Sequence, residues 1–461
     1  MTLIKSISGI RGTIGGKPND NLTPVDVVRF AAAYGTYILS QTNTSKAKII
    51  IGRDARISGS MVQALVSNTL IGLGIDVIDL GMATTPTVEM VVPKENAQGG
   101  IILTASHNPK QWNALKLLDS KGEFLNAAAG AHILDIADKE NFDFASVDDL
   151  GKISKNNTSL EMHIQEVINH PLVTVDKIKA SGLKIVVDGV NSIGGIAIPA
   201  LLKEFDLEVI ELYCEPNGQF PHNPEPLKEH LGALSEKVIE TGADLGIVVD
   251  PDVDRLAFMD ENGEMFGEEY TLVACADYVL SKKSGNTVSN MSSTRALRDV
   301  TEKHGGSYFS SAVGEVNVVT KMKEVDAVIG GEGNGGIIDP QLHYGRDSLI
   351  GTALFLSLLS GLKLSVSELK KTYPEYFMSK GKIELEPSME VDHLLNEIKK
   401  KYTDNKPNTI DGVKIDFENS WVHLRKSNTE PIIRVYTEAP SQLEADDLMN
   451  RFKAELLAFG N

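Results

Sequence analysis

The sequence predicts an α/β protein with three similar mixed α/β domains and a smaller C-terminal α+β domain, arranged around one central cleft. Two observations lead to this fold class. A strand–polar loop–helix–strand pattern occurs three times, whereas residues 371–461 contain short alternating strands and two amphipathic helices. The length of 461 residues also exceeds what one domain usually holds.

The three similar segments share an order of residue types. β-branched residues fill the predicted strands, and a loop rich in Ser, Gly, Asp or Asn opens each predicted helix. Strand–helix–strand units of this kind build parallel or mixed sheets that helices cover. The segments are Ala47–Gly81, Leu183–Tyr213 and Asn286–Gly314.

The predicted domains follow from these segments and from the change of pattern near the C-terminus. They are residues 1–152, 153–256, 257–370 and 371–461. Ligands of α/β proteins bind beside the loops at strand ends, so we expect each domain to contribute one loop to the cleft.

Composition and charge exclude several classes of partner. The net charge of −18, from 45 basic and 63 acidic residues, argues against nucleic acid. No apolar run reaches the roughly 18 residues of a membrane span, so no membrane association is expected. Cys214 and Cys275 lie in unrelated segments and fit reduced thiols. Because the N-terminal stretch also lacks a secretory signal pattern, we expect a cytoplasmic protein.

A serine follows the apolar run Gly99–Leu103, within the sequence TASHNP. Ser106 could simply belong to a turn, since Asn–Pro favours turns and Ser caps helices. A hydrolase nucleophile is disfavoured because the G-x-S-x-G elbow is missing. The third interpretation is a serine that carries a phosphoryl group, which requires a divalent metal and phosphate-binding groups elsewhere in the chain.

Asp250, Asp252 and Asp254 alternate directly after an apolar run. In an extended segment these positions face one side, where three carboxylates need a cation. Their oxygen atoms suit Mg²⁺, whereas an EF-hand is excluded because Arg255 stands where that loop requires Gly. A solvated acidic turn is the other alternative. Arg255 could ligate or orient a phosphate beside the three aspartates.

Three glycines from Gly331 to Gly336 match the G-x-G-x-x-G dinucleotide pattern. A Rossmann loop opens a helix, but the residues that follow have no helical period and include Pro340. The glycines more plausibly let the backbone bring Glu332 and Asn334 close to a ligand. Carboxylate and amide groups of this kind suit sugar hydroxyls.

A polar loop near the C-terminus combines guanidinium, hydroxyl and amide groups. Its residues are Arg425, Ser427, Asn428, Thr429 and Arg434. Such groups together bind a phosphate dianion, and a cationic cluster is informative in an acidic chain. The alternative is a hairpin turn with ordinary surface arginines.

The motifs TASHNP, DPDVDR, GEGNGG and RKSNTEPIIRVYTEA, in this order, resemble those of the α-D-phosphohexomutase superfamily. The resemblance covers essentially the whole chain and implies four domains, of which the first three are topologically similar. It also implies that Ser106 is a phosphoserine that gives up and regains its phosphoryl group. Asp250, Asp252 and Asp254 would then hold Mg²⁺ together with a phosphate oxygen on Ser106.

The resemblance implies further roles by position. Lys116 and His107 are both candidates for proton transfer, and Arg11 is placed near the phosphate that is transferred. The residues implied in substrate binding are Arg255, Glu332, Asn334, Arg425, Ser427, Asn428, Thr429 and Arg434.

The implied activity is that of an isomerase acting on a small phosphosugar. It moves a phosphoryl group between C6 and C1 of a hexose phosphate through a bisphosphorylated intermediate, with a hexose bisphosphate as activator. Glucosamine 6-phosphate is the expected substrate, and a phosphoglucomutase/phosphomannomutase is the close alternative, because Asn334 stands where many relatives have Ser. A non-catalytic phosphosugar-binding protein is a distant alternative. The oligomeric state is left open.

Overall fold

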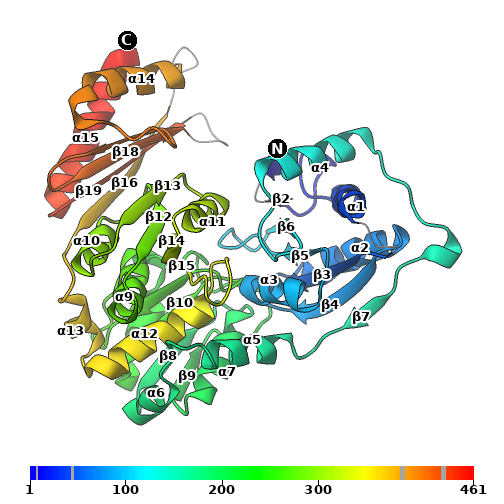
Figure 1. Cartoon of the computed structure of the whole chain (residues 1–461), viewed down its shortest axis with the longest axis horizontal. Coiled ribbons are helices and arrows are strands. Elements are labelled where there is room, and N and C mark those ends of the chain that lie inside the picture. The colour runs from blue at the N-terminus through cyan, green and yellow to red at the C-terminus, as the bar shows by residue number, and fades with distance from the viewer. Residues whose placement is uncertain (7–8, 43–45, 385–389, 427–431, 461) are drawn as a thin grey trace.

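The structure is a computed structural model that describes the chain except residues 7–8, 43–45, 385–389, 427–431 and 461. It contains one seven-stranded sheet and three four-stranded sheets in the described residues. Figure 1 shows the first unit on the right, the second and third units in green and yellow on the left, and the last unit in orange and red above them.

The first sheet has the strand order β1-β2-β6-β5-β3-β4-β7. Its strands are β1 (Ile4–Ser6), β2 (Gly9–Thr13), β3 (Lys48–Arg53), β4 (Asp76–Met82), β5 (Gly99–Leu103), β6 (Trp112–Leu118) and β7 (Ile153–Lys155). Its helices are α1 (Pro24–Gln41), α2 (Gly59–Gly72), α3 (Thr85–Lys94) and α4 (Ala127–Lys139). Successive side chains of β3 point to opposite faces of the sheet. Ile49 packs with α1, α2 and α4 on one face, and Ile50 packs with α3 on the other.

The second sheet, β11-β10-β8-β9, comprises β8 (Lys184–Asp188), β9 (Glu208–Leu212), β10 (Leu245–Val249) and β11 (Leu256–Met259). Its helices are α5 (Ser159–Ile168), α6 (Val175–Ser181), α7 (Gly194–Glu204) and α8 (Gly232–Thr241), with the short 3₁₀ helix η2 (Lys228–His230). The first sheet extends through β7 and the second through β11, a few residues past the predicted boundaries at 152 and 256.

The third sheet, β13-β12-β14-β15, comprises β12 (Asn286–Asn290), β13 (Tyr308–Ser311), β14 (Ala327–Glu332) and β15 (Gly336–Ile338). Its helices are α9 (Glu268–Lys282), α10 (Ala296–Lys303), α11 (Glu315–Glu324), α12 (Ser348–Leu362) and α13 (Val366–Lys370). The second and third units share one hydrophobic core, in which Phe258 stacks on Phe355 with ring centroids 3.8 Å apart.

The three sheets repeat one topology, as the sequence predicts. In each, three parallel strands are followed by an antiparallel one, in the orders β4-β3-β5-β6, β9-β8-β10-β11 and β13-β12-β14-β15. The predicted fold class is confirmed. Because the loop after the third parallel strand recurs, the loops after β5, β10 and β14 occupy equivalent places in the three units.

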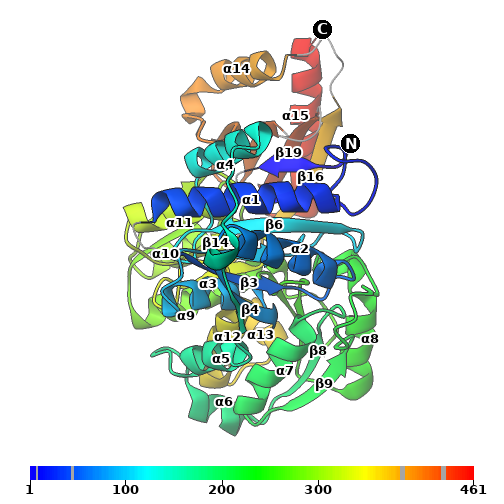
Figure 2. The same ribbon diagram turned by 90° about the vertical axis from the view of Figure 1, so that its right-hand side faces the viewer.

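The last unit has a wholly antiparallel sheet, β16-β19-β18-β17. Its strands are β16 (Phe377–Glu384), β17 (Val413–Asp416), β18 (Trp421–Lys426) and β19 (Ile432–Ala439), and its helices are α14 (Val391–Lys401) and α15 (Gln442–Gly460). Figure 2 shows this unit at one end of the molecule. A search of the described helices finds none with the length and apolar character of a bilayer span.

Candidate active site

Ser106 lies in the loop after β5 and is buried. Its φ of 48° is left-handed, a conformation that costs a non-glycine residue energy and recurs at functional sites. The backbone N–H of Ser106 donates to Thr104 Oγ1 at 3.0 Å, and Ser106 Oγ donates to Asp250 Oδ2 at 2.7 Å. The serine therefore projects from the first unit onto the aspartates of the second.

Arg56 holds the loop of Ser106 in place. Its guanidinium is fully buried and pairs with Asp54 at 2.9 Å, which also accepts the hydroxyl of Thr104. The remaining N–H groups of Arg56 donate to four backbone carbonyls, those of Ser106, Asn108, Pro109 and Trp112, at 2.5 to 3.0 Å. The sequence analysis missed Arg56, although a buried guanidinium can satisfy several carbonyls of one loop in this way.

The three aspartates lie between β10 and β11 and are fully buried. They do not form the extended segment that the sequence analysis assumed. Residues 251–253 make a turn in which Val253 has a φ of 65°, and the backbone N–H of Asp254 donates to Asp250 Oδ1. The carboxylates converge because of this turn, with one oxygen from each within 4.8 Å of the others.

The charge of the triad is only partly compensated by the chain. Burial, Asp252 and Asp254 raise the pKa of Asp250 well above its usual range. Lys116 Nζ lies 2.7 Å from Asp252 Oδ2 and 3.2 Å from Asp254 Oδ2. Among the described residues, Asp252 Oδ1 and Asp254 Oδ1 have no hydrogen-bond partner although both are buried. Unpartnered hard oxygen atoms beside a serine hydroxyl fit a divalent cation such as Mg²⁺.

Arg346, in the loop between β15 and α12, is a second residue that sequence reasoning missed. Its three nitrogens bind three carboxylates: Nη2 to Asp254 at 2.7 Å, Nη1 to Glu332 at 2.8 Å and Nε to Glu315 at 2.9 Å. Burial raises the pKa of Glu315 to about 7, against the opposing effect of Arg346. Arg346 thus joins the aspartate loop to the glycine-rich loop. Arg346 follows the glycine-rich loop in the sequence, but its contacts are with residues 14 to 92 positions away, which the local pattern does not show.

The glycine-rich loop follows β14 and leads into a strand, not a helix, which agrees with the rejection of a dinucleotide site. Glu332 Oε1 accepts from Asn290 Nδ2 at 2.9 Å and from the backbone N–H of Gly314 at 3.1 Å. Asn334 Oδ1 accepts from the backbone N–H of Gly336. A Cβ at Gly333 would lie 1.9 Å from Glu269 Oε2, so a larger residue here would have to displace the Glu269 carboxylate.

Arg11, His107 and Arg255 surround the serine loop with positive or neutral groups. Burial and Arg255 lower the pKa of His107 to about 2, so the imidazole is neutral. Burial and Arg255 also lower the pKa of Arg11, whose Nε has no partner in the described part of the chain. Arg255 Nη1 pairs with Glu225 at 3.2 Å. The structure therefore brings these predicted residues to the same region as Ser106.

The predicted phosphate-binding residues are only partly described. Arg425 on β18 and Arg434 on β19 stand opposite each other in the antiparallel register. Arg425 Nε lies 3.4 Å from Asp411 Oδ2, and Arg434 Nη1 lies 3.5 Å from the hydroxyl of Tyr436. The predicted partners Ser427, Asn428 and Thr429 lie outside the described residues.

The fold and the site together define a class of protein: four α/β and α+β units in which a serine loop, an acidic triad and a glycine-rich loop converge. Family comparisons match this class over nearly the whole chain. The matches are to "Phosphoglucomutase/phosphomannomutase" alpha/beta/alpha domains I, II and III at residues 3–144, 161–263 and 267–376, and to its C-terminal domain at 382–455. The chain belongs to the α-D-phosphohexomutase superfamily, whose enzymes are isomerases of the mutase type.

Individual relatives agree over almost full length. The "Phosphoglucomutase/phosphomannomutase" of Thermococcus kodakarensis is 34% identical, covering 95% of this chain and 96% of the relative. The "Phosphoglucosamine/phosphogalactosamine mutase" of Sulfurisphaera tokodaii is 31% identical, covering 96% and 97%. A crystal structure of a phosphoglucomutase/phosphomannomutase family protein from Burkholderia thailandensis has a TM-score of 0.85 at 24% identity, covering 99% of this chain and 98% of that one, so it supports the fold.

Proposed function

We propose that this chain moves a phosphoryl group between C6 and C1 of a hexose phosphate, and that glucosamine 6-phosphate is its preferred substrate. The observation that carries the proposal is the contact of Ser106 Oγ with Asp250 at 2.7 Å, made by a serine in a left-handed turn beside unpartnered carboxylate oxygens. A hydroxyl in this position can accept a phosphoryl group and return it.

The proposed chemistry depends on positioning and on neutralising charge. Asp250, Asp252 and Asp254 would hold Mg²⁺, which supplies positive charge to the phosphoryl oxygens. Arg56 keeps the backbone of Ser106 fixed, so the hydroxyl meets the phosphoryl group in one orientation. Arg11 and Arg255 offer guanidinium groups to the same phosphate.

Proton transfer and sugar binding use other side chains. Lys116 and His107 are the two candidates for moving the proton of the reacting hydroxyl. Lys116 pairs with Asp252, and His107 follows Ser106 in the sequence. Glu332 and Asn334 would bind sugar hydroxyls. Arg425 and Arg434, with Ser427, Asn428 and Thr429, would hold the phosphate that is not transferred.

A bisphosphorylated sugar is the intermediate of this scheme. Ser106 gives its phosphoryl group to one end of the sugar, and the intermediate then presents its other phosphate to the same serine. A hexose bisphosphate supplied from outside restores the phosphoserine and so acts as activator. Because the same phosphate site must hold either end of the sugar, it has to stand apart from the nucleophile.

The substrate choice within this class rests on relatives that carry both names. The alternative is a phosphoglucomutase/phosphomannomutase, which the relative at 34% identity favours. Glucosamine phosphates are favoured by the relative named for phosphoglucosamine and phosphogalactosamine. A substrate panel distinguishes the two.

The test combines mass and turnover. Intact mass of the purified chain, before and after phosphatase, should reveal one phosphate that maps to Ser106 and is missing in Ser106→Ala. With Mg²⁺ and a hexose bisphosphate, glucosamine 6-phosphate should turn over faster than glucose 1-phosphate or mannose 1-phosphate, and Ser106→Ala should be inactive. Turnover that persists in Ser106→Ala would overturn the mechanism. Sugar binding without any turnover would favour the non-catalytic alternative.

A further inference from the structure

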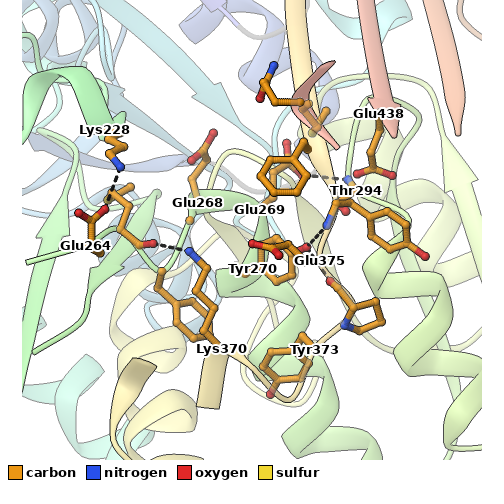
Figure 3. Close-up of a pocket in the computed structure, with 18 of the residues that line it drawn as sticks. Lys228, Glu264, Glu268, Glu269, Tyr270, Thr294, Lys370, Tyr373, Glu375 and Glu438 are labelled. Atoms are coloured by element: carbon orange, nitrogen blue, oxygen red, sulfur yellow. Dashed lines mark hydrogen bonds and ion pairs between the residues drawn. The ribbon is translucent and has the colours of Figure 1, made fainter. Parts of the chain in front are cut away.

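The structure contains a cavity of about 910 Å³ that none of the proposed catalytic residues lines. It lies where the segment after α13 passes from the third unit to β16 of the last unit. Residues of η2, the start of α9, this connecting segment and β19 form its walls. Figure 3 shows the side chains that face it. Its volume is typical of a site for a small molecule.

The lining is acidic, with seven carboxylate side chains against four lysines. At one end the lysines already have partners. Lys228 Nζ lies 2.8 Å from Glu264, and Lys370 Nζ donates to the carbonyl of Met265 at 2.6 Å. These two lysines therefore already contact groups of the chain.

At the other end the carboxylates outnumber their counter-ions. In the described part of the chain, Lys380 is the one cation paired with Glu268 and Glu269, at 3.4 and 3.8 Å. Burial, with Glu268 nearby, raises the pKa of Glu269 to about 8, because a charge there is poorly compensated. Glu438 is fully buried, and its Oε2 has no partner in the described residues although Oε1 accepts from Arg295 and Trp421. Burial raises the pKa of Glu438, so this carboxylate is costly to ionise without a partner, and a cationic ligand in the cavity would supply one.

Aromatic side chains lie among these carboxylates. Tyr270, Tyr376 and Phe377 line the cavity, and the hydroxyl of Tyr270 fixes the connecting segment by donating to the carbonyl of Pro374 at 2.7 Å. Aromatic rings pack well on aliphatic chains and attract ammonium groups. The wall thus offers both apolar faces and negative charge.

We propose that this cavity binds a linear aliphatic polyamine, with its ammonium groups paired to Glu268, Glu269 and Glu438 and its carbon chain against Tyr270, Tyr376 and Phe377. A polyamine combines spaced cations with an apolar chain, which is the pattern of this wall. An anionic metabolite is excluded by the excess of carboxylates, and a compact metal ion leaves the aromatic faces unused.

The position of the cavity gives the ligand access to the active-site loops. Glu269 accepts the backbone N–H of Thr294 at 2.9 Å and abuts Gly333 in the glycine-rich loop. Glu438 lies on β19, the strand that carries Arg434. A bound polyamine would therefore touch the supports of the sugar-binding loop and of the phosphate-binding strand at once.

The test is titration calorimetry of spermidine into the full chain at constant ionic strength. Wild type should bind with saturation at one site. Glu269→Gln and Glu438→Gln keep the side-chain volume and an acceptor oxygen, and each should weaken binding about tenfold, the effect of losing one partly buried ion pair. Lys380→Gln removes the competing cation and should tighten binding. Glu264→Gln, on the same wall but paired with Lys228, is the matched control and should leave binding unchanged.

The outcomes are decisive in each direction. No saturable binding, equal weakening in Glu264→Gln, or weaker binding in Lys380→Gln would overturn the proposal. If Mg²⁺ displaces spermidine at equal charge concentration, spermidine binding would reflect only the chain's overall negative charge. That result would also overturn the proposal. Ser106→Ala should bind spermidine like wild type, so failure of the mutase mechanism and failure of this site are measured separately. If Glu269→Gln or Glu438→Gln unfolds at a lower temperature, the affinity of Lys380→Gln for spermidine still tests the proposal.

Discussion

The two ends of the proposed active site are built differently. The backbone of the Ser106 loop is held by many contacts, with Arg56 donating to four carbonyls and Thr104 donating to Asp54. Arg425, in contrast, is partly exposed, and within the described residues its ion pair is a long one to Asp411 at 3.4 Å. The difference fits a nucleophile that must react in one orientation and a guanidinium that would adapt to a ligand.

The largest loss of activity is expected when the contacts of Arg56 with the Ser106 loop are weakened. Arg56→Lys leaves most of the four carbonyls without a donor and weakens the pairing with Asp54. We expect kcat to fall about 100-fold, since a shift of the nucleophile by about 1 Å costs that much. Stability should fall by about 3 kcal/mol, because buried carbonyls lose their donors and the buried ion pair with Asp54 is weakened. Steady-state kinetics and urea unfolding measure both.

Arg53→Lys is the matched control for that experiment. Arg53 lies three residues away in sequence and contacts Gln63 instead of the serine loop. Similar losses of kcat and stability in both variants would show that any change near the end of β3 harms the enzyme. Arg56 would then have no particular role in holding the Ser106 loop.

The next effect concerns the connection between loops. In Arg346→Lys a single ammonium cannot reach Asp254, Glu332 and Glu315 together, so the aspartate and glycine-rich loops should separate. We expect kcat/KM to fall about tenfold or more, with both kcat and KM affected. An unchanged kcat/KM would mean that Arg346 is a structural ion-pair residue only. Kinetics with the best hexose phosphate, at saturating Mg²⁺, provide the measurement.

A smaller effect on activity is expected at Arg425, in the proposed phosphate-binding site. Arg425→Lys keeps the charge but loses bidentate contact with a phosphate, so KM should rise about tenfold while kcat changes little. Arg451→Lys on the surface of α15 should leave KM unchanged. A fall in kcat without a rise in KM would contradict the comparison, because it would place Arg425 in positioning the reaction.

The smallest effect is a pH dependence of stability at the attachment of the last unit. His423 Nε2 donates to the carbonyl of Asp411 at 2.6 Å, and Nδ1 lies 2.9 Å from Ser292 Oγ, so the ring is neutral. Burial lowers the pKa of His423 to about 4. The unfolded chain takes up a proton below about pH 6.5 while the folded chain does not, so stability should fall as pH drops from 6.5 to 4.

His423→Gln tests that prediction. The variant should lose part of the stability difference between pH 7 and pH 5, on the order of 1 kcal/mol, in urea unfolding at the two pH values. An identical pH dependence in both proteins would assign the acid sensitivity to other groups.

Local patterns predicted the fold class and the cluster of three aspartates. The three repeated units follow from strand and helix periods, and Asp250, Asp252 and Asp254 are adjacent in sequence, so their convergence needs only a local turn. The sequence did not predict the roles of Arg56 and Arg346, because the groups that they bind are distant in the sequence. Arg56 is 50 positions from Ser106, and Arg346 is 92 positions from Asp254. Those contacts form only when distant segments pack together, and the hydrophobic pattern of the sequence does not predict them.

The ion pairs of the triad also bear on how the enzyme matures. Lys116 and Arg346 bring two positive charges to Asp252 and Asp254 from within the chain. If Mg²⁺ binds the triad as proposed, these ion pairs would support the folded shape before the metal arrives, and loading would be a late, exchangeable step. Chelation should then silence turnover while the melting temperature stays nearly the same, and fresh Mg²⁺ should restore activity without refolding.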